Sequence, residues 1–237
     1  MSKENFPALV KMTKFFLAPM APLQYFLDTP GVSHDYFLRQ AYEVLTLDGK
    51  EDVRTFFQPY HAQIRKGLFW ADRGWKNVCH FYANPEKSGS THWPGATAEA
   101  QYYFNHALSY FPQDVLKGMF YFGASLHIIQ DMTEPHHAVG SVFDGHQEFE
   151  KWVTQHWEDY SVNQGGIYPH FTHPSQYVES NAQQSASYYS LVSTHAHCNE
   201  ETYKDAAQDI IPLTIKTTAG YLDFMKNQLQ GVILRLQ

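Results

Sequence analysis

The segment from Gln113 to Asp131 limits the fold more than any other part of the chain. It is apolar nearly all round between Met119 and Ile129, which is typical of a helix buried at the centre of a protein. His127 and Asp131 are spaced four residues apart, so on a helix they share one face, one turn apart. Gly123 lies one turn earlier on that face and leaves room for another backbone or for an ion.

The rest of the chain also shows helical spacing of apolar residues, and the strand signal is weak throughout. A chain of 237 residues can bury one sizeable core, and no shift in composition marks a second domain. We therefore expect an all-α fold with one compact multi-helix domain. Besides the central helix, the predicted helices are 34–47, 97–111, 145–160, 175–195 and 200–236, and Pro135 is expected to end or kink the central one.

The charge and composition of the chain limit the classes of function that it can have. A formal net charge of -7 argues against a general binder of nucleic-acid backbones, which would carry a basic face. The 14 histidines favour metal binding. Cys79 and Cys198 are too few for a zinc–thiolate cluster, and the sequence does not decide whether they pair. Any zinc must therefore be held by histidine and carboxylate, the usual ligands of catalytic sites.

A second group of such residues follows the central helix. His137 lies beyond Pro135, where the chain has left the helix and can return to the same cavity from a new direction. His146 and Glu150 form another pair four residues apart on a predicted helix. Each pair alone is more often a structural contact or a solvated face. Together they concentrate so many ionisable groups that burying them without a metal would be costly.

These segments resemble the bacterial zinc-dependent phospholipase C family. The stretch GASLHIIQDMTEPHHA followed by GHQEFE is similar to the metal-binding core of that family. Three further stretches are similar to other parts of the family and occur in the same order: GVSHDYFLRQAYEVL to its first histidine helix, GLFWADRGWKNVCHFYANP to its next ligand segment, and TTAGYLDF to its closing helix. The resemblance thus extends from about Gly31 to Phe224, which is most of the chain.

The resemblance implies an all-helical domain that hydrolyses phospholipids to diacylglycerol and a phosphorylated headgroup, with two to three zinc ions. Asp72 is implied either as a ligand or as the base that orients the attacking water. The implied ligands are Asp72, His80, His127 and Asp131 for one ion; His34 with a shared Asp131 for another; and His137, His146 and Glu150 for the remaining one.

The sequence departs from the family at the N-terminus. The family binds one zinc through an N-terminal tryptophan just before the first histidine, but no tryptophan precedes His34 here. Residues 1–30 are interpreted as an extension or a processed segment, and residues 31–237 as the catalytic domain. Asp28 is a candidate substitute ligand, and the ion at His34 is the least secure. The resemblance implies an extracellular or periplasmic location, whereas the sequence has no clear signal peptide and leaves the cytoplasm open.

The substrate pocket departs as well. The family has an aromatic residue after the aspartate that matches Asp72, and this chain has Arg73 there. Another family aromatic is replaced by Asn77. A guanidinium would repel choline and suit an anionic headgroup or a second phosphate. The equally weighted alternative is that Arg73 only pairs with a nearby carboxylate.

Two other functions are compatible with the sequence. One is a zinc-dependent single-strand nuclease of the related P1/S1 class, and the other is a zinc-binding protein without catalysis. The expected partner is a phospholipid, with peripheral contact to a membrane surface and no stable binding of nucleic acid. The chain is expected to be a monomer.

Overall fold

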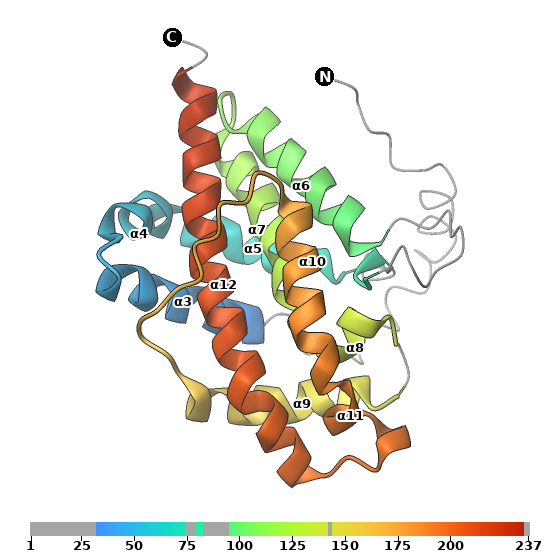
Figure 1. Ribbon diagram of the computed structural model, residues 1–237. Coiled ribbons are helices and arrows are strands. Elements are labelled where there is room, and N and C mark those ends of the chain that lie inside the picture. The colour runs from blue at the N-terminus through green and yellow to red at the C-terminus, as the bar shows by residue number, and fades with distance from the viewer. Residues whose placement is uncertain (1–31, 74–78, 83–94, 142–143, 235–237) are drawn as a thin grey trace.

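The structure is a computed structural model, and it describes residues 32–73, 79–82, 95–141 and 144–234. Within these ranges every regular element is a helix, which confirms the predicted all-α class (Figure 1). The predicted N-terminal segment 1–30, with Asp28, lies outside the described residues, and so does Asn77.

Ten α-helices make up the described fold, together with four 3-10 segments, and a longer irregular segment, residues 161–173, leads into α10 (Figure 1). They are α3 (Val32–Leu47), α4 (Glu51–Phe57), α5 (His61–Ala71), α6 (Ala96–Tyr110), α7 (Val115–Asp131), α8 (Pro135–Val139), α9 (His146–His156), α10 (Pro174–Ser185), α11 (Tyr189–Val192) and α12 (Glu200–Leu234). The 3-10 segments are η2 (Gln58–Tyr60), η4 (Trp157–Tyr160), η5 (Ala186–Tyr188) and η6 (Thr194–Ala196).

The predicted helices correspond to α3, α6, α7, α9 with η4, α10 with η5 and α11, and α12. The prediction of one continuous helix over 175–195 was wrong, because the α-helix ends at Ser185 and short turns follow. The sequence reading missed α4, α5 and α8. Pro135 does not kink α7, which ends at Asp131; instead it opens α8, where its missing N–H is not needed.

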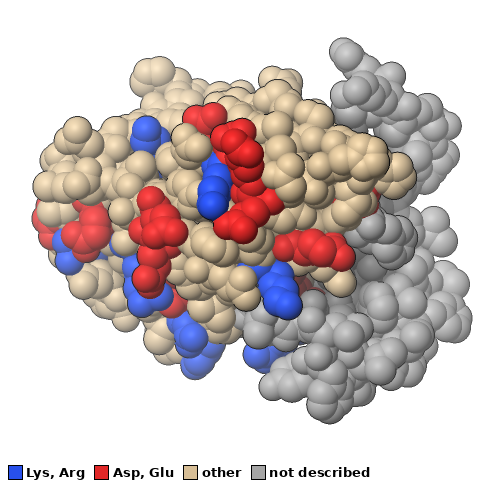
Figure 2. All heavy atoms as spheres, turned by 90° about the horizontal axis from the view of Figure 1, so that it is seen from below, with Lys and Arg blue, Asp and Glu red and all other residues tan. Residues whose placement is uncertain are grey.

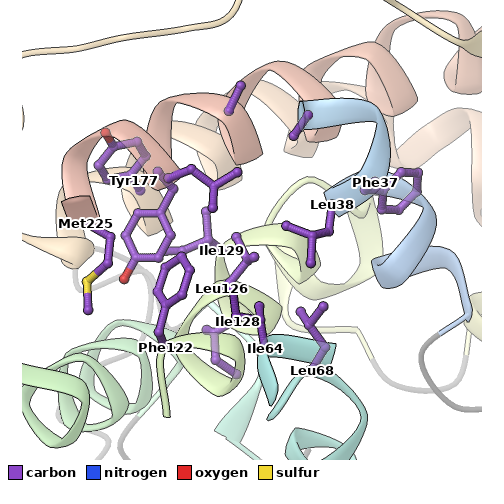
Figure 3. Packing of buried hydrophobic residues seen from close by; sticks show 14 of the residues in the cluster. Phe37, Leu38, Ile64, Leu68, Phe122, Leu126, Ile128, Ile129, Tyr177 and Met225 are labelled. Atoms are coloured by element: carbon purple, nitrogen blue, oxygen red, sulfur yellow. The ribbon is translucent and has the colours of Figure 1, made fainter. Parts of the chain in front are cut away.

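Helix α7 is the centre of the molecule, as its apolar character predicted. The carboxylate of Asp114 caps its first turn by accepting the backbone N–H of Lys117 at 3.0 Å. The helix then packs between α5 and α6. Figure 3 shows Ile64 and Leu68 of α5 close to Ile128 of α7, within the main hydrophobic core.

Two glycines allow the backbones of α5 and α7 to touch. A Cβ atom on Gly123 would lie 2.0 Å from the carbonyl oxygen of Ile64. A Cβ on Gly67 would lie 1.9 Å from the carbonyl oxygen of Phe120. The space predicted beside Gly123 is therefore filled by another backbone. This contact sets the distance between His127, one turn further along α7, and the carboxyl end of α5.

The C-terminal helices cover α7 and are joined to it by buried hydrogen bonds. The amide of Asn181 on α10 donates to the carbonyl of Ile129 at 2.9 Å. On α6, the carbonyl of Ala100 accepts from the hydroxyl of Ser125, which also lies 2.7 Å from the hydroxyl of Tyr221 on α12. Because these polar groups are buried, each bond fixes one helix relative to α7.

The structure also describes part of the charged surface and the two cysteines. Figure 2 shows acidic and basic side chains intermixed on one face of the molecule, without a continuous basic area among the described residues of that face. Cys79 is buried, Cys198 is partly exposed, and no disulfide joins the two. Among the described helices, none combines the length and the apolar character needed to cross a bilayer.

We expect the substitution Gly123→Ala to lower the free energy of unfolding by about 1–3 kcal/mol, because the added methyl group must push α5 away from α7. Urea denaturation followed by circular dichroism measures this change. Gln208→Ala at an exposed position of α12 serves as the control and should stay within about 0.5 kcal/mol of the wild type. Equal stability of both variants would contradict the close contact.

Candidate metal centre

Asp131, the last residue of α7, is the centre of the candidate site. Its Oδ2 atom lies 2.8 Å from Nδ1 of His80 and 3.1 Å from Nε2 of His127. Its Oδ1 atom lies 3.4 Å from Nε2 of His34. The two carboxylate oxygens therefore face different histidines, as a carboxylate shared between two metal ions would require.

Asp72 completes this first group from the carboxyl end of α5. Its Oδ1 atom lies 2.9 Å from Nε2 of His127 and 3.5 Å from Nδ1 of His80. Both histidines are fully buried, whereas the Asp72 side chain is 24% exposed, so solvent reaches the cluster at this aspartate. We call Asp72, His80, His127 and Asp131 the first pocket; one ligand atom from each lies within 4.8 Å of the others.

The buried atoms of the first pocket fit a metal ion. His80 Nδ1 and Asp131 Oδ2 are close, but neither has a partner with the geometry of a hydrogen bond. Buried polar atoms without such partners are costly, and a cation between them would satisfy both. Two imidazoles and two carboxylates are also the donor set expected for zinc when thiolates are absent.

Neighbouring groups orient the histidines, as is usual around metal sites. The other ring nitrogen of His80, Nε2, lies 3.7 Å from Oε2 of the buried Glu99, whose Oε1 accepts from the hydroxyl of Tyr103 at 2.8 Å. The side-chain oxygen of Gln130 accepts Nδ1–H of His34 at 2.8 Å. This bond leaves Nε2 of His34 facing Asp131. The sequence reading missed Glu99 and Gln130, whose partners come from distant helices.

The second pocket contains the predicted residues His137, His146 and Glu150. Nδ1 of His137 donates to the carbonyl oxygen of His80 at 2.9 Å, which turns its Nε2 toward Glu150 Oε1 at 3.5 Å. Nε2 of His146 lies 3.0 Å from the same oxygen. The backbone of His80 thus joins the two pockets. The second pocket is the more open of the two, since the Glu150 side chain is 50% exposed.

The structure adds two residues to this region. Glu134 precedes α8, and its Oε2 lies 3.7 Å from Nε2 of His146. His136, for which the sequence suggested no partner, is fully buried and lies 2.7 Å from Oε1 of Glu134 through Nδ1. Proline is common at the first position of a helix, so Pro135 could have indicated that a helix begins there and that Glu134 occupies its N-cap position.

The electrostatics of both pockets follow from burial and from charge pairing. Burial alone would raise the pKa of Asp131, but the charges of His127 and His137 hold it well below its usual range. Burial alone would lower the pKa of His127, and the carboxylates of Asp131 and Asp72 hold it well above its usual range. Burial alone would also lower the pKa of His137, but the carboxylates of Asp131, Glu150 and Glu134 outweigh it and raise this pKa to about 10. Without a metal, protons on His127 and His137 balance the carboxylates, and a cation would displace those protons.

His34 behaves differently. Its burial and the adjacent His127 both lower its pKa, and they outweigh the carboxylates of Asp131 and Asp72. Its ring is therefore neutral and offers a lone pair at Nε2 toward Asp131. Arg73, the predicted headgroup residue, is exposed and directly follows Asp72, with its backbone N–H donating to the carbonyl oxygen of Trp70 at 3.1 Å.

The chain is similar in sequence to curated phospholipases C. It is 26% identical over 227 residues to a phospholipase C of Bacillus cereus, covering 80% of this chain and 79% of the relative. A second phospholipase C of Bacillus cereus is 26% identical over 168 residues, covering 62% of this chain and 58% of that relative. No family model matches the chain.

Solved structures show the same fold. The alpha-toxin of Clostridium perfringens from the avian strain SWCP superposes with a TM-score of 0.71 at 17% identity, covering 86% of this chain. The alpha-toxin of Clostridium absonum gives a TM-score of 0.68 at 18% identity, covering 82% of this chain. This chain spans 66% and 63% of the length of the two toxins. The predicted resemblance to the bacterial zinc-dependent phospholipase C family is therefore confirmed.

Proposed function

We propose that this protein is a zinc-dependent phospholipase C-type phosphodiesterase, which hydrolyses phospholipids to diacylglycerol and a phosphorylated headgroup. The observation that carries the proposal is the first pocket, where four ionisable side chains converge and buried polar atoms lack hydrogen-bond partners. The sequence similarity to curated phospholipases C supports the substrate class.

The proposed zinc ligands are the eight residues identified from the sequence. Asp72, His80, His127 and Asp131 would hold one ion; His34 and Asp131 a further one; and His137, His146 and Glu150 another. Zinc bound in such sites lowers the pKa of water and stabilises the charge that builds on phosphorus. Two ions are proposed for the two pockets, and the third depends on residues before Val32.

Asp72 is the proposed catalytic residue of the first pocket. It lies at the accessible edge of the cluster, whereas His80 and His127 are fully buried. Burial alone would raise the pKa of Asp72, but His127 holds it below its usual value, so the carboxylate is ionised. An ionised carboxylate at this edge can hold a water molecule for attack on the phosphate and accept its proton. Asp72 can serve as a ligand through one oxygen and still orient water through the other.

The substrate preference is proposed to depend on Arg73. It follows Asp72 on the exposed side of the site, where its guanidinium suits an anionic headgroup or a second phosphate better than choline. Contact with phospholipid places the protein at a membrane surface during turnover. An extracellular or periplasmic location is proposed from the resemblance to bacterial phospholipases C.

The first test is hydrolysis of phosphatidylcholine and phosphatidylglycerol in mixed micelles, with release of diacylglycerol as the readout. We expect activity with added zinc and none after chelation. Asp72→Asn should lower kcat by about 100-fold or more, because the amide cannot accept the proton of the attacking water.

The control for Asp72→Asn is Asp114→Asn. Asp114 precedes the first turn of α7, at the end of that helix away from the site, and the amide oxygen of asparagine can still cap the helix there. This variant should keep nearly all activity. The same samples are assayed on single-stranded DNA. Zinc-dependent cleavage of DNA without phospholipid hydrolysis would contradict the proposal and favour the nuclease alternative. Bound zinc with neither activity would favour a binding protein.

Substitution of Arg73 tests the headgroup preference. Arg73→Gln should lower kcat/KM for phosphatidylglycerol about ten-fold, the loss expected when one charge-assisted hydrogen bond is removed. The value for phosphatidylcholine should not fall. Lys66→Gln removes the same charge from an exposed position on α5 and is the matched control. An equal decrease for both lipids would mean that Arg73 pairs with a neighbouring carboxylate and has no role in selection.

A further inference from the structure

Glu134 lies at the second pocket, although it was not among the predicted ligands. Its side chain is only 14% exposed, and its Oε2 atom lies 3.7 Å from Nε2 of His146. One ligand atom each from Glu134, His137 and His146 lies within 4.8 Å of the others. Glu134 is therefore close enough to both histidines to share an ion with them, as the predicted ligand Glu150 is.

The three separations that join a histidine to a glutamate here are compatible with one coordination sphere. Ligand atoms about 2 Å from a tetrahedral zinc ion lie roughly 3.3 Å apart. Glu150 Oε1 lies 3.0 Å from His146 and 3.5 Å from His137, and Glu134 Oε2 lies 3.7 Å from His146. We infer that Glu134 is a fourth protein ligand of the second pocket, beside His137, His146 and Glu150. This inference rests on the proposed function only in requiring that the pocket bind a metal ion.

The carboxylate of Glu134 is held in place before any ion arrives. Its Oε1 atom lies 2.7 Å from Nδ1 of His136, and Nε2 of His136 lies 2.7 Å from the carbonyl oxygen of Asp144. The carbonyl can only accept, so Nε2 of His136 donates to it. Glu134 is thereby connected to the chain that leads into α9, the helix that carries His146 and Glu150. Ligands from α8 and α9 are thus brought together by one buried contact.

Asp144 anchors this connection from the other side. Its carboxylate accepts five hydrogen bonds from α11 and the segment after it, namely from the hydroxyls of Tyr189, Ser193 and Thr194 and from the backbone N–H and ring Nδ1 of His195. A carboxylate with that many donors is strongly fixed. Glu134 is therefore oriented through His136 by a rigid support, which is how neighbouring groups prepare ligands for a metal.

A second carboxylate changes the charge balance and the number of protein ligands in the second pocket. Two glutamates neutralise the two positive charges of a zinc ion, whereas Glu150 alone would leave one charge uncompensated. Four protein ligands also fill a tetrahedral shell, which is typical of ions that are held firmly. The ion of the second pocket is therefore expected to bind independently of substrate. The alternative is that Glu134 only caps α8, since its Oε2 accepts the backbone N–H of His137 at 2.8 Å.

Glu134→Gln separates these two roles. The amide keeps the shape of the side chain, offers an oxygen to the N–H of His137 and an N–H to His136, and so preserves the cap. It removes the charge and is a poor zinc ligand. Glu150→Gln shows what the loss of one predicted ligand costs. Glu148→Gln changes the same charge at an exposed position of α9 and is the matched control.

Each full-length variant is titrated with Zn²⁺ against a competing chelator, and with Co²⁺ to record the visible absorption of the bound ion. We expect Glu134→Gln and Glu150→Gln to weaken one and the same ion at least ten-fold and to leave the first pocket filled. At saturation, the Co²⁺ absorption of that ion should differ from the wild type in Glu134→Gln. Glu148→Gln should resemble the wild type in both measurements, and circular dichroism should be unchanged in all variants.

Wild-type affinity in Glu134→Gln would show that Glu134 only caps α8. Weaker binding with an unchanged Co²⁺ spectrum at saturation would likewise overturn the ligand assignment, because Glu134 would then act only through His137. If Glu134→Gln weakens the ion and changes its Co²⁺ spectrum while neither protein hydrolyses phospholipid, Glu134 is confirmed as a ligand and only the proposed function is wrong. A wild type without any ion in this pocket would contradict both.

Discussion

The contact between the backbones of α5 and α7 is the constraint on which the candidate site depends. Gly67 and Gly123 remove the side chains that would separate the two helices. As a result Asp72, at the end of α5, lies 2.9 Å from His127 on α7. A larger residue at either glycine would move one aspartate of the first pocket away from the other ligands. The packing of α5 against α7 in the core therefore determines the geometry of the first pocket.

Backbone groups also join the two pockets. The carbonyl oxygen of His80 accepts the ring N–H of His137 at 2.9 Å, so a ligand of the first pocket orients a ligand of the second. Asp131 faces histidines through both of its oxygens. Any shift of the segment that carries His80 would therefore change the positions of ligands in both pockets. We expect their metal affinities to be coupled for this reason.

Regular patterns made the core of the site predictable from sequence. The apolar character of α7 and the two pairs spaced four residues apart depend on local helix geometry, whereas His34, Asp72 and His80 were expected only from the family resemblance. The structure brings seven of the eight predicted ligands into the two pockets and places the eighth, His34, 3.4 Å from Asp131. Glu134 and Gln130 escaped prediction, because their roles arise from how α8 and α3 pack and no local spacing reports that. α5 was missed although it carries the glycine that places Asp72. Its partner helix lies some fifty residues away in the sequence.

The central claim is that the two pockets are metal sites in the folded protein. Crystals of the zinc-reconstituted protein, measured at and below the zinc absorption edge, test this claim most directly. If both pockets bind zinc, we expect two strong anomalous peaks. One should lie between Asp72, His80, His127 and Asp131, and the other between His137, His146 and Glu150. Absence of anomalous density from both pockets, with the side chains paired to one another as hydrogen-bonded ion pairs, would contradict it.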